Sequence, residues 1–411
     1  MTTTEFSPTT QSELARFVAE NSVGERQTIC PVGGRTALHY GFSTKATDAV
    51  LSMSELTRVV DYPARDMTIT VEAGMRIDEL QATLASERQR LPIDIAQAER
   101  ATLGGALATN TSGPRRFGHG TFRDYVIGIS AVDAHGRAFK AGGRVVKNVA
   151  GYDICKLLVG SRGTLAVVTQ VTLKLRPLAE TSALLWSSFQ RLDDIERTLE
   201  RLLTSGARPV AVEVLNPAAA KLIAALSRCE LPVDSPVLCL GVEGSQREVE
   251  WQIETLRNES TPFGMKSSDV IAEPEAASLW QALTEFQTCA DDPLTFQANV
   301  RPSECIAFVE RATKLNVAVQ AHAANGIAIG QLPESTATIS ETTTILNELR
   351  QAARSRGGNL HILHCDSEWQ PLLPMCGEPE PSWPLMKQLK QKLDPHGLLN
   401  PGLFMDGASL R

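Results

Sequence analysis

Two glycine-rich segments contain the residue types that bind an anion. They read P-V-G-G-R-T at 31–36 and T-L-G-G-A-L-A-T-N at 102–110. Glycine lets a backbone approach a ligand closely and adopt positive φ, and successive backbone N–H groups in such a turn form an anion-binding concavity. Arg35 adds a cation beside the first glycine pair, and Thr36 and Thr109 add hydroxyl groups. The two segments therefore predict a site for a phosphate or pyrophosphate group.

The alternative is that both segments are ordinary tight turns. A single G-G-R-T sequence is a turn in most proteins, and it is the second, chemically similar segment that favours a ligand. Neither segment is a G-x-G-x-x-G opening a helix or a G-x-x-x-x-G-K-[ST] loop, so neither a Rossmann site nor a P-loop is indicated. If a nucleotide binds here, it is held in another way.

Metal chemistry finds little support in the histidines and cysteines. His361 and His364 lie in L-H-I-L-H-C, which predicts a buried strand whose residues three apart face opposite sides. The eight cysteines contain no C-x-x-C pair and no cluster with the short spacings of zinc or iron–sulfur ligands. We expect no metal site, and reduced, mostly buried thiols.

The elements around the glycine segments predict an α+β domain. Apolar spacing and a Thr or Ser cap predict a helix at 9–22, and a β-rich stretch at 27–31 leads into the G-G-R-T loop. Two strands joined by a turn are predicted at 59–74, where polar and apolar residues alternate. The remaining elements are strands at 50–56, 124–139 and 165–176 and a helix at 76–88.

From about residue 180 glycine becomes scarcer, and amphipathic helices alternate with short strands. This β-α-β-β-α-β rhythm predicts a small antiparallel sheet with helices on one face. The chain then divides into a domain at 1–178, a cap domain at 179–383 and a C-terminal segment at 384–411. The predicted elements after 180 are helices at 192–203, 217–228, 246–257 and 384–393 and strands at 210–216 and 235–244.

Composition limits the classes of function. The 411 residues are 43% hydrophobic and 21% charged with a net charge of −7, which is ordinary for a globular protein of two domains. The absence of a Lys/Arg-rich run argues against a nucleic-acid surface. The polar N-terminus and the lack of a long apolar stretch predict a cytoplasmic protein that reaches a membrane only through partners.

Further motifs occur in a characteristic order along the chain. They are T-I-T-V-E-A-G at 68–74, L-P-I-D at 91–94, F-G-H-G-T-F-R-D at 117–124, V-V-K-N-V-A-G-Y-D at 145–153, G-S-R-G-T-L-A-V-V-T at 160–169 and D-P-H-G-L-L-N-P-G at 394–402. Together with the two glycine segments they resemble the FAD-binding PCMH-type domain of the vanillyl-alcohol oxidase superfamily. Within it, V-K-N-V-A-G-Y-D-I-C-K-L-L-V-G-S looks most like the FAD-binding subunits of bacterial glycolate oxidases.

The resemblance implies a two-subdomain FAD domain, an α/β cap domain with an antiparallel sheet, and a tail that returns to the FAD domain. By position, it assigns the pyrophosphate to Val32, Gly33, Gly34, Arg35, Thr36 and Ala37, the second phosphate and flavin-side loop to Thr102, Gly104, Gly105, Thr109, Ser112, Gly113, Gly118 and Thr121, the ribose and adenine to Asp124, Gly163 and Val168, and the flavin ring to Asn400. For Asn400 a plain helix-ending turn remains the alternative. Arg35 stands where some relatives carry a flavin-linking His, so the resemblance implies non-covalent FAD.

The catalytic residues stay unknown at this point. Relatives carry a motif like H-x-G-D-G-N-x-H in the cap domain, and the nearest match here is H-A-A-N-G-I-A-I at 322–329. His322 is present, but Asn325 and Ile329 replace the acidic residue and the final His. Lys147, Asn148 and Tyr152 lie in a loop that either contacts substrate or an electron partner, or packs the FAD loop.

Three functions follow from the resemblance. The first is an FAD-binding subunit of a glycolate (2-hydroxy-acid) oxidase complex that works with a second flavin subunit and an iron–sulfur subunit. The second is a free-standing FAD-dependent dehydrogenase of a small hydroxy acid or an alcohol. The third is an FAD-bearing scaffold subunit without substrate chemistry of its own.

Overall fold

The chain forms two compact units. The computed structural model describes residues 4–38, 40, 47–143, 152–288, 293–336, 338–355 and 357–403. Unit 1 contains Met1–Thr111, Thr121–Leu178 and Glu378–Arg411, and unit 2 contains Ser112–Gly120 and Ala179–Gly377. The placement of 112–120 in unit 2 differs from the continuous 1–178 domain expected from the sequence.

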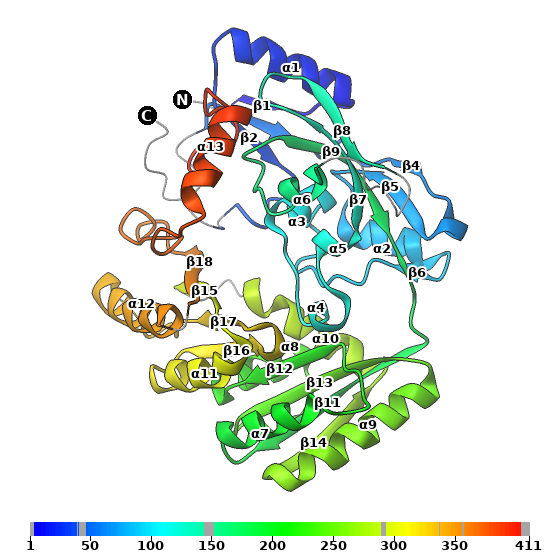
Figure 1. The fold of residues 1–411 in the computed structure, drawn as a ribbon, viewed down its shortest axis with the longest axis vertical. Coiled ribbons are helices and arrows are strands. Elements are labelled where there is room, and N and C mark those ends of the chain that lie inside the picture. Colours follow the sequence, from blue (N-terminus) through cyan, green and yellow to red (C-terminus); the bar gives the residue numbers. More distant parts are fainter. Residues whose placement is uncertain are drawn as a thin grey trace. The chain divides into compact units, whose positions relative to one another are not determined.

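Unit 1 begins with a small α/β layer (Figure 1). Helix α1 starts after Thr10, whose side chain accepts a hydrogen bond from the Glu13 backbone N–H, and it buries Leu14 and Val18 against a parallel sheet. The sheet has the order β1-β3-β2, and Leu399 of the C-terminal segment bridges to Ile29 in β2. These elements are α1 (Gln11–Val23), β1 (Thr4–Phe6), β2 (Ile29–Val32) and β3 (Ala49–Ser52).

The rest of unit 1 is a five-stranded antiparallel sheet with the order β4-β5-β9-β7-β8. All five residues of β5 are buried, so this strand lies in the interior of the layer. The strands are β4 (Val59–Asp61), β5 (Thr68–Glu72), β7 (Val126–Val132), β8 (Ala138–Gly142) and β9 (Val167–Lys174), and the helices are α2 (Ile77–Ala85), α3 (Leu103–Thr109), α5 (Phe122–Tyr125), α6 (Ile154–Leu158) and α13 (Trp383–Leu393). A short pair, β6 (Gln89–Arg90) and β10 (Arg176–Pro177), completes the unit.

Unit 2 is built on an eight-stranded sheet among the described residues, with the order β14-β11-β13-β12-β16-β17-β15-β18 and antiparallel pairing throughout. The strands are β11 (Thr181–Phe189), β12 (Ala211–Leu215), β13 (Val237–Gly244), β14 (Met265–Ala272), β15 (Leu294–Asn299), β16 (Ala318–His322), β17 (Ile327–Gln331) and β18 (Asn359–Cys365). The predicted antiparallel cap sheet is confirmed, but it is larger than expected.

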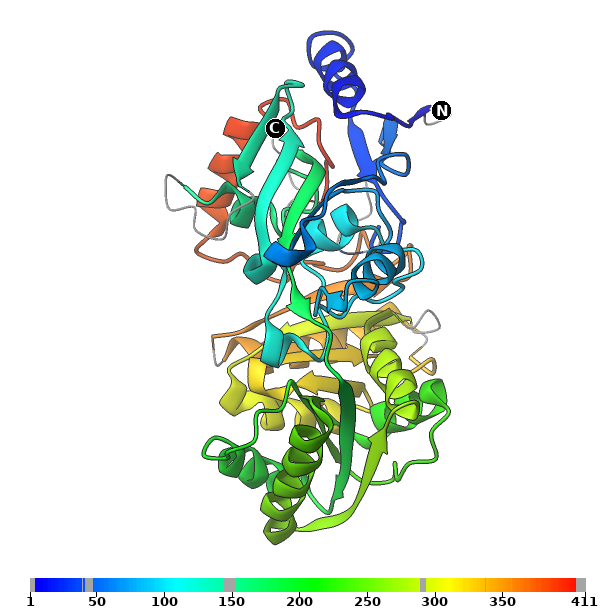
Figure 2. The same cartoon turned by 90° about the vertical axis from the view of Figure 1, so that its right-hand side faces the viewer.

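Helices cover both faces of this sheet, so the prediction that they lie on one face is wrong (Figure 2). On one face, α8 and α10 pack on Leu184, Trp186 and Cys239 in a single core cluster. The alternate strand residues, such as Leu185 and Leu240, are also fully buried, because α7, α9, α11 and α12 cover the other face. The helices are α7 (Leu192–Leu202), α8 (Pro217–Ser227), α9 (Gln246–Ser260), α10 (Glu275–Glu285), α11 (Cys305–Lys314) and α12 (Ile339–Arg354).

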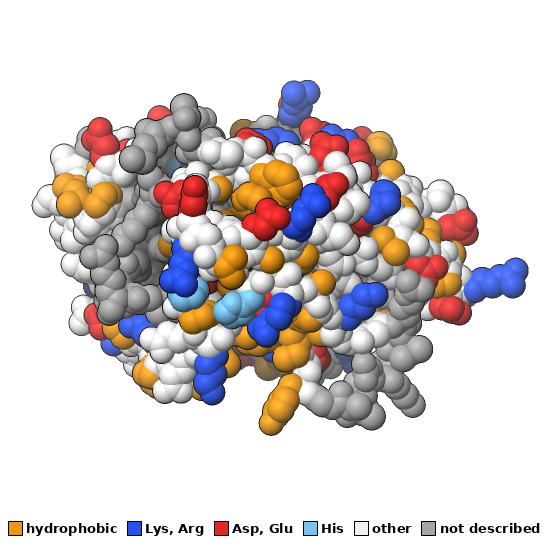
Figure 3. Space-filling model, turned by 90° about the horizontal axis from the view of Figure 1, so that it is seen from above, with side chains coloured by type: hydrophobic (Ala, Val, Ile, Leu, Met, Phe, Trp, Pro, Cys, Tyr) orange, Lys and Arg blue, Asp and Glu red, His pale blue; other side chains and the backbone are white. Residues whose placement is uncertain are grey.

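The face seen in Figure 3 does not gather charge of one sign. In the view of Figure 3, acidic and basic side chains alternate with small apolar groups over the described residues. Within the described ranges, no helix has the length and apolar character needed to cross a membrane.

Candidate functional site

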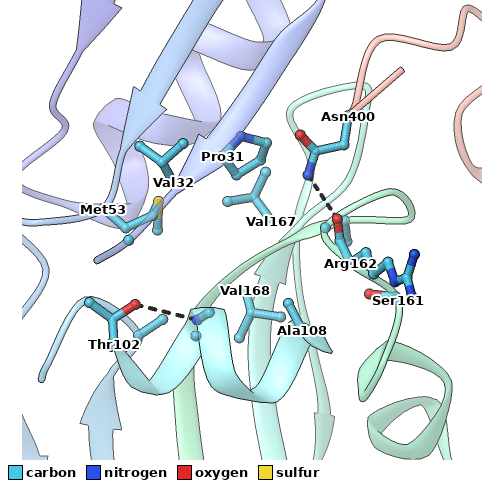
Figure 4. Close-up of a pocket in the computed structure, with 16 residues that line it drawn as sticks. Pro31, Val32, Met53, Thr102, Ala108, Ser161, Arg162, Val167, Val168 and Asn400 are labelled. Atoms are coloured by element: carbon cyan, nitrogen blue, oxygen red, sulfur yellow. Dashed lines mark hydrogen bonds between the residues drawn. The ribbon is translucent and has the colours of Figure 1, made fainter. Parts of the chain in front are cut away.

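A pocket in unit 1 lies between β2, α3, the loop at 161–164 and the C-terminal segment (Figure 4). The pocket opens to solvent and has about 490 Å³ of empty space, and an adjoining open hollow of about 570 Å³ shares part of its wall. Val32, Met53, Val167 and Val168 give the pocket apolar walls, while Arg162 adds a charged side chain.

Most of the residues assigned to FAD by resemblance line these two hollows. They are Val32, Gly33, Gly34, Arg35, Thr36, Ala37, Thr102, Gly104, Gly105, Thr109, Gly163, Val168 and Asn400. Thr121 and Asp124 belong to unit 1 but form the capping box of α5, with the Thr121 N–H donating to Asp124 Oδ2 at 2.9 Å. Ser112, Gly113 and Gly118 lie in the part of the chain that belongs to unit 2.

The first glycine pair allows two backbone segments to meet. A Cβ on Gly34 would lie 1.6 Å from the Arg100 carbonyl oxygen, and one on Gly33 would lie 1.9 Å from Thr102 Oγ1. No side chain fits at such distances, so both glycines are required by close approach. Arg35 follows in the left-handed region with φ +58°. The loop thus turns sharply at the edge of the pocket.

The second glycine segment is the first turn of a helix, which corrects the expectation of a turn like the first loop. Thr102 caps α3, and its Oγ1 accepts from the Gly105 N–H at 3.4 Å. The Gly104 N–H donates to the Ala73 carbonyl at 2.7 Å. A Cβ on Gly104 would lie 2.9 Å from Ala73 Cβ, so this glycine allows α3 to pack on the end of β5.

The wall opposite α3 contains Arg162, which was not assigned from the sequence, beside Gly163 and Asn400, which were. Arg162 lines both hollows and adopts φ +53°, and Gly163 follows with φ +66°. The Asn400 Nδ2 donates to the Arg162 carbonyl at 2.8 Å, while Asn400 Oδ1 is buried and has no hydrogen-bond partner among the described residues. A cation beside a glycine in S-R-G-T was the available signal, and it matches the Arg35 pattern.

Unit 2 contains a buried acid–imidazole pair that the sequence did not reveal. His322 Nδ1 lies 2.8 Å from both carboxylate oxygens of Glu213, and neither side chain is exposed by more than 3%. Gln320 Nε2 also donates to Glu213 Oε2 at 2.8 Å. The two partners face each other across the β12–β16 pairing. Ile329, where relatives carry the final His of the motif, shares the apolar core on this face.

His361 and His364 lie on the same face of β18, so the prediction that they face opposite sides is wrong. A β-bulge shifts the register, so that His361 pairs with Gln297 and His364 with Thr295, two residues apart on β15. A bulge adds one residue to a strand and so reverses the alternation beyond it. The described residues nevertheless contain no group of three or more His, Cys, Asp or Glu side chains placed to hold a metal ion.

Three loop residues singled out in the sequence have separate outcomes. Lys147 and Asn148 lie outside the described residues. Tyr152 is described, and 96% of its surface is exposed. The structure therefore gives Tyr152 no packing role.

The fold and the pocket define a flavoprotein of the PCMH type. The FAD binding domain family matches residues 5–142, and the family of FAD linked oxidases, C-terminal domain, matches 178–361 and 371–403. The chain therefore belongs to the FAD-linked oxidase family, and it is an FAD-dependent oxidoreductase.

Curated relatives resemble the chain over most of its length. Glycolate oxidase subunit GlcD of Bacillus subtilis is 28% identical over 96% of this chain and 87% of the relative. Glycolate oxidase subunit GlcE of Escherichia coli is 27% identical over 84% and 83%. D-2-hydroxyglutarate dehydrogenase of Xanthomonas citri is 27% identical over 92% and 84%.

Solved structures share the fold. A p-cresol methylhydroxylase structure superposes with a TM-score of 0.74 at 14% identity, covering 99% of this chain and 89% of its own. An alkyldihydroxyacetonephosphate synthase structure gives 0.68 at 17% identity, covering 97% and 76%. The expected α+β architecture with a PCMH-type domain and a cap is confirmed.

The pocket residues fit FAD. Backbone N–H groups and the cation of Arg162 suit a pyrophosphate, and the valines suit a flat aromatic ring system. The Arg35 guanidinium is paired with the Glu5 carboxylate at 3.0 Å. The buried Asn400 Oδ1 is an acceptor without a partner among the described residues, and a ligand that donates a hydrogen bond would satisfy it.

Proposed function

We propose that this chain is the FAD-binding subunit of a 2-hydroxy-acid oxidase or dehydrogenase complex that converts glycolate to glyoxylate. The observation that carries the proposal is the similarity to two glycolate oxidase subunits, GlcD and GlcE, over more than four fifths of each relative. It is supported by a pocket in which the glycine segments and the C-terminal Asn400 meet.

The reaction removes two electrons and two protons from the alcohol. Oxidation of a 2-hydroxy acid takes the α-hydrogen with its electron pair and the hydroxyl proton, and leaves the 2-oxo acid. FAD supplies the acceptor of that electron pair when it is bound. The chain's own contribution is to hold the cofactor and to exclude water from it.

For the cofactor we assign roles to the pocket-lining residues. The backbone N–H groups of 33–37 would hold the pyrophosphate, and the Arg35 guanidinium would join them by leaving its ion pair with Glu5. Thr102 and Thr109 would line its far side, and Asn400 would contact the flavin. Gly163 and Val168 would face the ribose and adenine. Ser112, Gly113, Gly118, Thr121 and Asp124, which do not line the pocket, remain predictions from the resemblance alone.

The partners would be a second flavin subunit and an iron–sulfur subunit. The cysteines of this chain lack cluster spacing, so a chain of electron carriers would have to continue on another polypeptide. Any contact with a membrane would then be made through the complex.

Two other functions remain in competition. A free-standing hydroxy-acid dehydrogenase is favoured by the similarity to D-2-hydroxyglutarate dehydrogenase over 92% of the chain. A scaffold subunit that carries FAD without substrate chemistry is favoured by Ile329, which places an apolar side chain where relatives carry a histidine.

Absorbance spectroscopy separates the three functions. The purified chain should be yellow, unbleached by glycolate or D-lactate when alone, and bleached once a second flavin subunit and an iron–sulfur subunit are co-expressed with it. Bleaching of the isolated chain would favour the free-standing enzyme. To test for a scaffold, the complex is rebuilt with this chain freed of FAD before assembly. If glycolate then bleaches the partner flavin to the same extent, this chain has no redox role.

A further inference from the structure

Hydrogen bonds to Asp394 and to β2 hold the C-terminal segment beside the pocket. The Leu398 and Leu399 N–H groups donate to the two carboxylate oxygens of Asp394 at 2.9 and 2.8 Å. The Ile29 N–H of β2 donates to the Leu398 carbonyl at 2.7 Å, and the Asn400 N–H donates to the Ile29 carbonyl at 2.9 Å. The segment therefore extends the sheet edge that leads into the first glycine loop.

A buried lysine adds three hydrogen bonds to this network. Lys390 on α13 is 1% exposed and Asp394 is fully buried. The Lys390 ammonium donates to the Asp394 carboxylate at 2.5 Å, to the Leu399 carbonyl at 3.0 Å and to the Thr164 carbonyl at 2.7 Å. An ammonium has three N–H donors, so all three are satisfied. Burial lowers the pKa of Lys390, while the Asp394 carboxylate opposes that change.

Two of these acceptors belong to the segments that form one wall of the pocket. Thr164 ends the loop whose residues Ser161, Arg162 and Gly163 line it, and Leu399 precedes Asn400, which lines both hollows. Asn400 also donates directly to the Arg162 carbonyl. The two segments are thus joined twice, once by Asn400 at the pocket surface and once by Lys390 beneath it.

We propose that Lys390 is a positioning residue for the cofactor: it holds the 161–164 loop and the Asn400 segment at the spacing that FAD binding requires. Asp394 orients the ammonium and the Asn400 segment together. Neither side chain lines the pocket, so their effect on FAD reaches it through Arg162 and Asn400. The proposal concerns the cofactor site alone and holds whichever substrate the enzyme uses.

The test compares FAD affinity with stability in the full-length chain. Lys390→Met removes the ammonium and keeps the length of the side chain, and Lys392→Met is the matched control on the exposed side of α13. The apoprotein is titrated with FAD, and quenching of flavin fluorescence gives the Kd. We expect the Kd to rise by about tenfold or more in Lys390→Met, because hydrogen bonds to a charged group are lost. In Lys392→Met the Kd should stay unchanged.

A second variant separates positioning from a buried unpaired charge. In the double variant Lys390→Met/Asp394→Asn no charge is left alone, so stability in urea should recover in part relative to Lys390→Met. The recovery is partial because the two Asp394 oxygens accept from the Leu398 and Leu399 N–H groups, and a carboxamide has only one oxygen. FAD affinity should stay weak because the tie to Thr164 is still missing. Wild-type affinity in the folded double variant would overturn the proposal.

Hydrogen exchange provides a readout that needs no variant. In the wild-type chain, FAD should slow exchange at the Leu398 and Leu399 amides as well as in 161–164, because one ammonium links both segments. If FAD slowed exchange only in residues that line the pocket, the proposed link through Lys390 would be contradicted. This result does not depend on whether the Lys390 variants fold.

Discussion

The Asn400 side chain donates to the Arg162 main-chain carbonyl at 2.8 Å, across 238 residues of sequence. This bond joins the C-terminal segment to a loop that lines the FAD pocket. It also turns the carboxamide oxygen away from Arg162, and that oxygen is buried without a partner among the described residues. Asn400 is therefore placed both to hold the pocket wall and to accept a hydrogen bond from a ligand.

Asn400→Gly should weaken FAD binding by roughly tenfold, because one hydrogen bond inside the pocket wall and one acceptor are lost. Asn400 adopts φ +45°, which glycine tolerates and alanine does not. Asn400→Ala should therefore lose the same affinity and also about 1 kcal/mol of unfolding free energy. Fluorescence titration gives the first quantity and urea unfolding gives the second. Equal FAD affinity in Asn400→Gly and the wild type would contradict the assignment.

Gly34→Ala should destabilise even the apoprotein. Its Cβ would lie 1.6 Å from the Arg100 carbonyl oxygen, and overpacking of this kind costs about 1–3 kcal/mol or more. Gly105→Ala is the matched control in the same pocket, because its Cβ would meet only Thr102 Oγ1 at 3.3 Å. Urea unfolding of the two apoproteins provides the comparison. If both variants unfolded at the same urea concentration, the close approach of Gly34 to Arg100 would be disproved.

Local signals allowed much of unit 1 to be predicted. Thr10 marks the start of α1, and alternating residues mark β5, because caps and periodicity act within a few residues. Helix α3 could not be predicted, since a glycine pair disfavours a helix by propensity. Its packing on Ala73 outweighs that cost, and Ala73 lies 31 residues before Gly104.

The contacts between residues of the site could not be predicted from the sequence for the same reason. Arg162 meets Asn400 because the C-terminal segment returns to a loop 238 residues earlier. Glu213 meets His322 because β12 and β16 pair in a particular register. The bulge that turns His361 and His364 to one face depends on β15, another strand. Alternation within a single strand contains no information about any of these contacts.

Gly118→Ala should lower the stability of unit 2. Gly118 donates its N–H to the Val210 carbonyl at 3.0 Å, and an added Cβ would lie 2.7 Å from Val210 Cα. We expect a loss of about 1–3 kcal/mol, with the FAD Kd changed by less than about threefold. Gly206→Ala, whose Cβ would only touch Trp251 at 3.4 Å, should unfold like the wild type. A large rise in Kd without destabilisation would instead support a direct FAD contact at Gly118.

Stability should fall as pH rises above about 9, partly through buried thiols. Burial raises the pKa of Cys155 from 9.0 to about 11, so the folded state keeps a proton that the unfolded state loses. This contribution is complete below pH 9 and is lost between about pH 9 and 11, with an upper limit of about 3 kcal/mol. Urea unfolding at pH 8 and pH 10.5 measures the loss. Cys155→Ala should reduce the difference between the two pH values, and an unchanged difference would refute this assignment.

Glu213→Gln should destabilise unit 2 and change the tautomer of His322. The Glu213 carboxylate accepts from His322 Nδ1 and from Gln320 Nε2 in a site without water-exposed surface. His322 Nδ1 lies 2.8 Å from both Glu213 oxygens, whereas Gln320 Nε2 lies 2.8 Å from Oε2 alone. An amide has one oxygen and one NH₂ group, so in either orientation its NH₂ group lies within reach of His322 Nδ1. Where the NH₂ group faces His322, the proton on Nδ1 must move to Nε2. Breaking a buried pair of this kind costs about 3–5 kcal/mol.

Nitrogen-15 NMR of the imidazole distinguishes the two tautomers, and urea unfolding measures the stability. Glu254→Gln removes the same charge from an exposed position on α9 and should cost less than about 0.5 kcal/mol. If Glu213→Gln lost no more unfolding free energy than Glu254→Gln, the Glu213–His322 pair would have no structural role. Because Glu213 and His322 lie on different strands, the same variant also reports whether the β12–β16 pairing depends on the acid–imidazole contact or only on the backbone ladder.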